Sequence, residues 1–268
     1  MLGIPLSLSI KEHILDMHLT DRVVMVTGGG SGIGRACVEA LTAEGAKVLI
    51  VDRSTVGETT AAGLRAEGHD VEYVQTDVSN EADVESALQA VERIFGRLDS
   101  VIGCAGVSGP VGLNATQVSV EAWDHVMAVN VRGNFLVAKH SVGLLSKSPA
   151  PSMVLLGSDS ALVAFEGMTP YSTSKGAVLM LTKSLAVDHP LIRFNCLCPG
   201  IVDTPMSRTD LARPEGFTGS NLPVIRPDQI ARHAVFLASP VSAPINGTTL
   251  VADFGYTARS AMPALNFS

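Results

Sequence analysis

Short apolar runs rich in Val, Ile and Leu alternate with longer amphipathic stretches from about residue 21 to residue 255. The predicted strands are residues 22–28, 47–52, 70–77, 100–106, 152–158, 192–200 and 248–253. The predicted helices are residues 32–45, 55–68, 80–96, 119–145, 170–189 and 227–239. Strands that alternate with helices in this way form repeated βα units on a parallel sheet. The pattern therefore predicts a single α/β domain, built on a doubly wound seven-stranded parallel sheet with helices on both faces.

Length, charge and cysteine content limit what such a domain does. The 268 residues, of which 46% are hydrophobic, are enough to bury a large core. The net charge of -7, without any block of Lys and Arg, gives no electrostatic site for nucleic acid or for an anionic membrane surface. Four unevenly spaced cysteines do not make a disulfide framework, which favours a reducing, cytoplasmic setting. We therefore expect a small-molecule partner.

Two segments fall outside the repeated pattern. The N-terminal run "MLGIPLSLSI" lacks a basic region, contains Pro5 and continues into Lys11 and Glu12, so it fits neither a signal peptide nor a membrane span. We expect residues 1–18 to be a loosely ordered extension and residues 19–268 to form the folded domain. Residues 204–226, rich in Pro, Gly, Arg and Ser, are predicted to be a loop at the substrate site.

The first predicted strand ends in the glycine-rich turn "TGGGSGIG", residues 27–34, and a helix begins inside it. Gly28 permits a tight turn, Gly32 lets the backbone approach a pyrophosphate, and Gly34 allows the helix to pack against the strand. A glycine cluster alone also fits a purely structural turn. The position of this cluster, between a first strand and the N-terminus of a first helix, favours a nucleotide site.

The second predicted strand ends at Asp52, where a carboxylate is placed to accept hydrogen bonds from the ribose of an adenosine. The same carboxylate repels the additional phosphate of NADP, and the glycine turn holds no basic residue to offset it. Arg53 is the counter-evidence, because a guanidinium can pair with that phosphate. We expect NAD rather than NADP as the cofactor.

The stretch "YSTSK" places Tyr171 and Lys175 four positions apart, on one face of a predicted helix. Taken alone, such a pair would be an exposed helix face. Pro170 suits a first helical position, which puts Tyr171 in the opening turn, and Ser158 ends the strand before that helix. Ligands of open α/β folds bind at this carboxyl edge of the sheet. The three side chains are therefore candidate catalytic residues.

Together these motifs resemble the classical short-chain dehydrogenase/reductase family, over roughly residues 19 to 257. The family's Thr-Gly-x-x-x-Gly-x-Gly motif looks like residues 27–34. Its catalytic serine and its Tyr-x-x-x-Lys pair match Ser158, Tyr171 and Lys175. The resemblance implies a Rossmann-type fold, an NAD(P) cofactor and a homo-oligomer, typically a tetramer. The apolar residues all round segment 178–187 also favour an oligomer.

The resemblance also implies further site residues. The asparagine of the family's catalytic tetrad matches Asn130 in "VNVRGNF", where it is implied to hold a water that links Lys175 to solvent. A hydrogen bond to the backbone would also account for this asparagine. Residues 77–78 look like the adenine pocket, and residues 199–204 look like the segment that holds the nicotinamide carboxamide. The cofactor-binding residues implied are Gly28, Ser31, Gly32, Ile33, Gly34, Asp52, Arg53, Asp77, Val78, Cys104, Ala105, Gly106, Tyr171, Lys175, Pro199, Gly200, Val202 and Thr204.

The sequence departs from the family pattern at two places. Cys104, in "GCAG", replaces an asparagine that ties adjacent strands to the cofactor pocket. Phe254, in "DFG", replaces a glycine, and we expect it to affect subunit packing or the rim of the site. Cys196 and Cys198 share one face of a strand, but the sequence has no second close cysteine pair and no HExxH spacing. We expect core cysteines and no metal.

The chemistry of the implied roles follows from acid–base properties. A free phenol has a pKa near 10, and lowering it by about three units needs roughly 4 kcal/mol of preferential phenolate stabilisation. A neighbouring ammonium and the positive nicotinamide supply this in a desolvated site. Tyr171 would take the proton of an alcohol while hydride passes to C4 of the nicotinamide, and Ser158 would hold the substrate oxygen.

The expected function is NAD-dependent interconversion of a secondary alcohol, such as a polyol or another hydroxylated metabolite, and its ketone. The alternatives are an NADPH-dependent ketoreductase, such as a 3-oxoacyl reductase, and a non-catalytic NAD-binding sensor. The complete catalytic set argues against the sensor. An extended-family epimerase or dehydratase would have a different glycine spacing and a larger C-terminal region. The pocket walls are expected from residues 107–108, 160–168 and 205–225, and they leave the substrate open.

Overall fold

A seven-stranded parallel sheet forms the centre of the protein in the computed structural model, which describes residues 16–259. The strands are β1 (Val23–Thr27), β2 (Lys47–Asp52), β3 (Val71–Gln75), β4 (Ser100–Gly103), β5 (Ser152–Leu156), β6 (Arg193–Pro199) and β7 (Thr249–Ala252). Their order across the sheet is β3-β2-β1-β4-β5-β6-β7, so the winding direction reverses between β1 and β4. This confirms the predicted fold, and the reversal is where a ligand crevice forms in such sheets.

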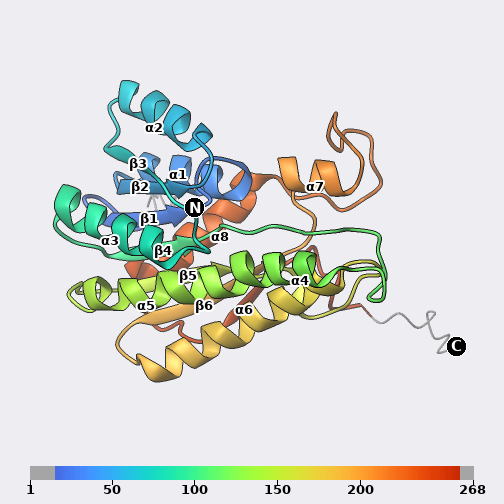
Figure 1. Cartoon of the computed structure of the whole chain (residues 1–268). Coiled ribbons are helices and arrows are strands. Elements are labelled where there is room, and N and C mark those ends of the chain that lie inside the picture. The colour runs from blue at the N-terminus through green and yellow to red at the C-terminus, as the bar shows by residue number, and fades with distance from the viewer. Residues whose placement is uncertain (1–15, 260–268) are drawn as a thin grey trace, which may run out of the picture.

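Helices cover both faces of the sheet, because its central strands β1, β2, β4, β5 and β6 are buried on both sides (Figure 1). On one face lie α1 (Gly32–Ala43), α2 (Val56–Ala66) and α8 (Pro227–Ala238). On the other lie α3 (Glu81–Phe95), α4 (Val120–Met127), α5 (Gly133–Leu145) and α6 (Thr169–Asp188). Two separate apolar cores therefore hold the sheet between them.

Local signals in the sequence fix several helix ends. The Asn80 side chain accepts a hydrogen bond from the backbone N–H of Ala82 and so caps the N-terminus of α3. The same helix ends at Gly96, which adopts a left-handed φ of +72° that glycine tolerates at no steric cost. The predicted strands and helices agree with the observed ones to within three residues at each end, apart from two segments.

The two segments differ from the sequence-based expectation for identifiable reasons. The predicted helix 119–145 is divided into α4, one π-helical turn over Ala128–Arg132, and α5. The predicted loop 204–226 instead begins with helix α7 (Pro205–Asp210). Thr204 and Ser207 cap this helix reciprocally, and Pro205 occupies its first turn. The expectation of a continuous loop was therefore wrong for residues 205–210, because it was based on composition and overlooked the capping residues.

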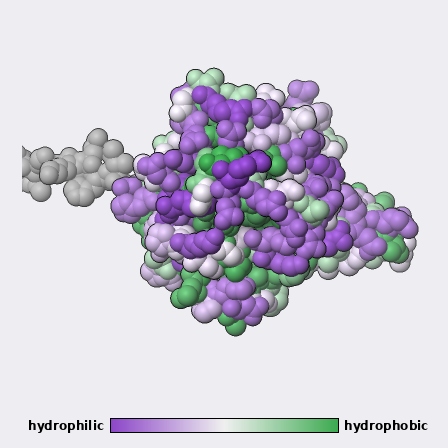
Figure 2. Space-filling view, turned by 60° about the vertical axis from the view of Figure 1, so that its left-hand side comes forward, coloured by the Kyte–Doolittle hydropathy of each residue, from purple (hydrophilic) through white to green (hydrophobic). Residues whose placement is uncertain are grey.

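The ends of the chain add little to this architecture. Most of the predicted N-terminal extension lies outside the described residues, whereas Leu19 is buried in the core on the α1 side. Within residues 16–259, no helix combines the length and the apolar character that crossing a membrane requires. On the face drawn in Figure 2, hydrophilic residues predominate and apolar residues gather only in small areas.

Candidate active site

A cavity of about 430 Å³ opens at the carboxyl ends of β1, β4, β5 and β6. It is lined by every residue that the sequence predicted to bind the cofactor, and by Ser158, Tyr171 and Lys175. Asn130 does not line it. Segments far apart in the chain thus bring the glycine turn and the candidate catalytic residues together in one site.

The glycine turn leaves the N-terminus of α1 open toward this cavity. Gly28 has a φ of +66°, and a Cβ at this position would lie 2.8 Å from the backbone nitrogen of Ala105. Ser31 precedes α1, and its side chain makes no capping hydrogen bond. The backbone N–H groups of the first turn therefore stay available, and together with the helix dipole they suit a pyrophosphate. The turn fits a dinucleotide.

Asp52 lies at the end of β2 and already organises the glycine turn. Its Oδ2 accepts a hydrogen bond from the backbone N–H of Gly30 over 2.9 Å, and its Oδ1 accepts one from the backbone N–H of Ser54 over 2.9 Å. The carboxylate therefore holds a fixed place in the cavity wall. Arg53 lines the same end of the cavity, and its side chain is exposed.

Asp77 lines the cavity at the carboxyl end of β3. Its Oδ1 accepts hydrogen bonds from the Ser79 hydroxyl over 2.7 Å and from the Ser79 backbone N–H over 2.9 Å. These hydrogen bonds lower the pKa of the Asp77 carboxyl below its ordinary value, and the hydroxyl makes the largest contribution. A second carboxylate, that of Asp77, therefore borders this part of the site together with Asp52.

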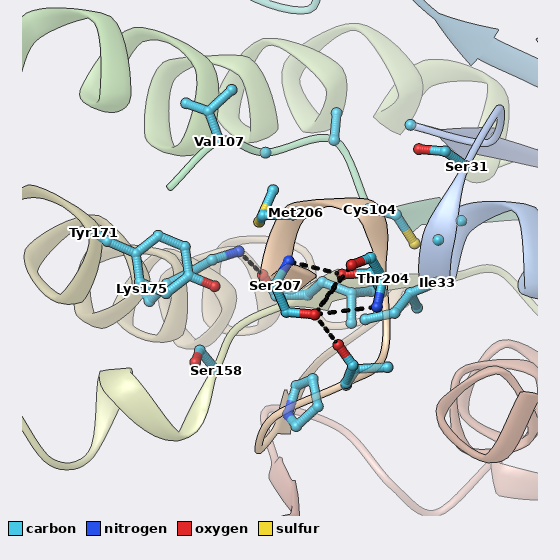
Figure 3. Close-up of a pocket in the computed structure, with 18 of the residues that line it drawn as sticks. Ser31, Ile33, Cys104, Val107, Ser158, Tyr171, Lys175, Thr204, Met206 and Ser207 are labelled. Carbon is cyan, nitrogen blue, oxygen red and sulfur yellow. Dashed lines mark hydrogen bonds between the residues drawn. The ribbon is translucent and has the colours of Figure 1, made fainter. Parts of the chain in front are cut away.

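Tyr171 and Lys175 lie one turn apart near the start of α6. The Lys175 ammonium is 5.5 Å from the centre of the Tyr171 ring and donates a 2.7 Å hydrogen bond to the carbonyl of Leu156. The lysine is buried, so its charge is poorly screened by water. In Figure 3, Ser158, Tyr171 and Lys175 lie on one side of the pocket, across from Ser31 and Ile33 of the glycine turn.

Ser158 follows β5 and caps the short 3₁₀ turn Asp159–Ala161. Its Oγ accepts a hydrogen bond from the backbone N–H of Ser160 over 3.1 Å and donates one to Asp159 Oδ1 over 2.9 Å. The hydroxyl is therefore held in place before any substrate arrives. Asp159 also lines the cavity, and the sequence analysis missed it although it is the next residue in the chain.

Asn130 lies in the π-helical turn and is buried behind the cavity wall. Its Oδ1 accepts a hydrogen bond from Val107 N, and its Nδ2 donates to Val107 O, both over 2.8 Å. Its Nδ2 also donates to Ser174 Oγ over 2.9 Å. The side chain thus joins the loop after β4 to α6, one residue before Lys175. Two of these three hydrogen bonds are to backbone groups, as in the alternative that the sequence analysis left open.

The remaining walls of the cavity agree in large part with the three predicted segments. They are mostly apolar, and they come from the loop after β4, the segment before α6, and α7. The residues concerned are Val107, Val111, Ser160, Phe165, Met168, Met206, Ser207, Asp210 and Leu211. Ser108 does not line the cavity, but its hydroxyl donates a 2.9 Å hydrogen bond to Asp210 and so links two of its walls. The sequence analysis did not single out Asp210.

The two departures from the family pattern have local explanations. The backbone N–H of Cys104 donates to Thr27 O over 3.1 Å, and the Thr27 hydroxyl accepts from Ala105 N over 3.2 Å. Strands β1 and β4 are thus tied together next to the cysteine without an asparagine side chain. Phe254 adopts a left-handed φ of +55°, which shows why glycine suits this position. Nearby, Tyr256 stacks on the wall residue Phe165 at 5.9 Å between ring centres.

Burial raises the pKa of the Asp159 carboxyl above its ordinary value, and the negative charge of Asp253 raises it further. The hydrogen bonds with Ser158 and Ser160 lower this pKa but do not offset the effect of burial. The folded chain therefore binds this proton more tightly than the unfolded chain does. Ionised Asp159 thus costs stability once the pH rises above the unfolded pKa of ~3.9. We expect Asp159→Asn, which keeps an acceptor for Ser158, to raise Tm by a few degrees at pH 7.5 and less toward pH 4.5. Thermal denaturation at both pH values checks this, and an unchanged or lower Tm at pH 7.5 contradicts it.

Known proteins share this sequence and architecture. A family model described as "Enoyl-(Acyl carrier protein) reductase" matches residues 28–257. The chain is 38% identical over 247 residues to a 2-(R)-hydroxypropyl-CoM dehydrogenase of Xanthobacter autotrophicus, which covers 88% of this chain and 99% of that protein. The chain belongs to the short-chain dehydrogenase/reductase family. A D-threitol dehydrogenase of Mycolicibacterium smegmatis is 34% identical over 251 residues, covering 91% of this chain and 96% of that one.

A solved structure extends the comparison to three dimensions. The 3-ketoacyl-(acyl-carrier-protein) reductase of Brucella melitensis, complexed with NADH, superposes with a TM-score of 0.81 and 31% identity. The match covers 89% of this chain and 99% of that one. This short-chain dehydrogenase/reductase is therefore an NAD(P)-dependent enzyme that interconverts a secondary alcohol and its ketone.

Proposed function

We propose that the protein is an NAD-specific dehydrogenase of a hydroxylated small molecule, with Tyr171 as the general acid and base. The observation that carries the proposal is that Ser158, Tyr171 and Lys175 line the same cavity as a glycine turn suited to a dinucleotide. Relatives named for threitol and for cyclopentanol support a polyol or a cyclic alcohol as the kind of substrate. Catalysis would take place within one domain, with the segment 204–226 against the substrate.

The side chains divide the chemistry of alcohol oxidation between them. When bound in the cavity, NAD⁺ would supply the acceptor for the hydride of the carbinol carbon. Tyr171, as the phenolate, takes the hydroxyl proton of the alcohol, so that the ketone forms as the carbon loses hydride. The buried Lys175 ammonium, 5.5 Å from the Tyr171 ring, favours that phenolate by its charge. Ser158 would hold the substrate oxygen beside Tyr171, and reduction of the ketone runs the same steps in reverse.

Asp52 supports the choice of NAD over NADP. Its carboxylate is fixed by the N–H groups of Gly30 and Ser54, and a 2'-phosphate placed beside it would meet a like charge. We expect kcat/KM for NAD⁺ to exceed that for NADP⁺ by at least about tenfold on one alcohol, a difference of ~1.4 kcal/mol. In Asp52→Asn the ratio should shrink, chiefly through a lower KM for NADP⁺. Rates of NADH and NADPH formation check this. A wild-type preference for NADP⁺ would contradict it and would show that pairing of Arg53 with the 2'-phosphate outweighs repulsion by Asp52.

The assembly and setting that we propose are a homo-oligomer, a tetramer as is typical of the family, in a reducing cytoplasm. Three apolar side chains on or just after α6 support self-association. They are strongly exposed, at 57% for Met180, 79% for Val187 and 87% for Leu191, and a partner subunit would cover them. Four free cysteines, three of them buried, support the reducing setting.

A further inference from the structure

The part of the cavity beyond Ser158 and Tyr171 has an unusual distribution of charge. Its apolar wall is formed by Val107, Val111, Phe165, Met168, Met206 and Leu211. Two carboxyl groups, Asp159 and Asp210, interrupt this wall. Among the residues of the described chain that line the cavity, only Arg53 and Lys175 are basic, and Arg53 belongs to the end occupied by Asp52.

The basic side chains of this end of the cavity and of α7 are already engaged. Lys175 donates to the Leu156 carbonyl and lies beside the Tyr171 ring, so its charge acts on the reacting oxygen of any alcohol. Arg208, on α7, binds both carboxylate oxygens of Asp203, over 2.6 and 3.1 Å, and does not line the cavity. A positive charge for the remote end of a substrate is therefore absent from the walls that the structure describes.

Asp210 is fixed at the edge of the cavity, where α7 meets the loop after β4. Its Oδ1 accepts the hydrogen bond from the Ser108 hydroxyl over 2.9 Å, and no other described residue donates to this carboxyl group. Burial raises the pKa of Asp210 above its ordinary value, against the effect of that hydrogen bond. The ionised form is therefore poorly hydrated, and it has room for a donor or a cation but repels an anion.

Asp159 adds to this preference from beside Ser158. Its Oδ1 is engaged by the Ser158 hydroxyl, while its Oδ2 lies 3.7 Å from the position that a Cβ on Gly200 would occupy. Asp253, close to the same glycine, carries a further negative charge that is held by the N–H groups of Gly255 and Thr257. A substrate that extends from Tyr171 along this wall thus lies in a field of negative sign.

We propose that the substrate is a secondary alcohol whose remote substituent is uncharged or cationic, and that remote carboxylates, sulfonates and phosphates are excluded by Asp210 and Asp159. The inference rests on the proposed function for the reaction itself. It adds the chemical class of the substituent, which the catalytic residues do not determine. The positive charges of Lys175 and of bound NAD⁺ act at the carbinol and are common to every substrate, so the walls decide between substituents.

Three alcohols of nearly equal shape test the charge preference. They share a 2-hydroxypropyl group and end in tert-butyl, trimethylammonium or sulfonate, and each is used as both enantiomers. We expect kcat/KM with NAD⁺ to be at least about tenfold higher for the first two than for the sulfonate. Asp210→Asn keeps an acceptor for the Ser108 hydroxyl and should reduce that difference in kcat/KM severalfold. Asp70→Asn removes the same charge from an exposed residue directly before β3, at the edge of the sheet opposite the cavity, and should leave that difference in kcat/KM unchanged.

Binding separates this inference from the proposed function. The Kd of each alcohol for the Tyr171→Phe protein saturated with NAD⁺ is measured by calorimetry, which needs no turnover. Weaker binding of the sulfonate than of the other two alcohols supports the charge preference, even if no alcohol is oxidised. A lack of oxidation would contradict only the proposed function. Equal or tighter binding of the sulfonate overturns the charge preference, whether or not the alcohols are oxidised.

Discussion

Replacing Tyr171 by Phe is expected to lower kcat by at least about 100-fold, because general acid–base catalysis by one positioned side chain contributes roughly 10²–10⁴-fold. The phenol ring remains as a benzene ring, so its packing beside Lys175, at 5.5 Å from the ammonium, is preserved. NAD⁺ should therefore bind with nearly the wild-type Kd. Initial rates of NADH formation and calorimetric titration with NAD⁺ measure the two quantities separately.

Tyr256→Phe is the matched control for this substitution. It removes the same hydroxyl from a tyrosine that does not line the cavity but stacks on the wall residue Phe165, with 5.9 Å between the ring centres. Its hydroxyl makes no hydrogen bond to a described residue, so we expect kcat within about twofold of the wild type. A Tyr171→Phe protein that retained a third or more of the wild-type kcat would contradict the assignment of Tyr171 as acid and base.

The second large effect is expected at the glycine turn. A Cβ on Gly34 would run into the carbonyl oxygen of Gly28, so Gly34→Ala forces α1 away from β1. Overpacking of this kind costs about 1–3 kcal/mol, which lowers Tm by roughly 2–4 °C for each kcal/mol in a protein of this size. The first turn of α1 moves with the displaced backbone, so we expect Kd for NADH to rise at least about tenfold.

Gly63→Ala makes the same chemical change without the collision. Gly63 lies inside α2, and a Cβ there meets no atom within 4 Å. Alanine in a helix interior stabilises the folded state by about 0.5–1 kcal/mol relative to glycine. This variant should therefore be slightly more stable than the wild type and should bind NADH normally. Thermal denaturation and NADH fluorescence titration compare the two variants. If Gly34→Ala matched Gly63→Ala in both readouts, the close helix–strand contact would not be needed for the cofactor.

The sequence predicted the parts of the site that depend on local spacing. The end of β1, the turn before Gly34 and the first turn of α6 are each determined by residues within a few positions of one another. The parallel order of the strands then brings Ser158 and Tyr171 to the same sheet edge as the glycine turn. Local pattern and topology together were sufficient to predict that the glycine turn, Ser158, Tyr171 and Lys175 line one cavity.

The parts that were missed depend on contacts between distant segments. Asp210 reaches the cavity because α7 forms and because Ser108, 102 positions earlier in the chain, binds its carboxyl group. The interpretation of residues 204–226 as a loop hid that helix. For Asn130, spacing could indicate a match to the family but could not show that Val107 and Ser174 take up its side-chain hydrogen bonds.

The most direct test of the central claim follows the hydride itself. Wild-type protein and Tyr171→Phe are incubated with NAD⁺ and a panel of secondary alcohols that carry deuterium on the carbinol carbon. Mass spectrometry of the reduced cofactor and of the ketone then reports transfer. We predict deuterated NADH and an equal amount of ketone from the wild type, and at most about a hundredth of that rate from the variant. Reduced cofactor without deuterium, or equal rates for the two proteins, would contradict hydride transfer coupled to proton removal by Tyr171.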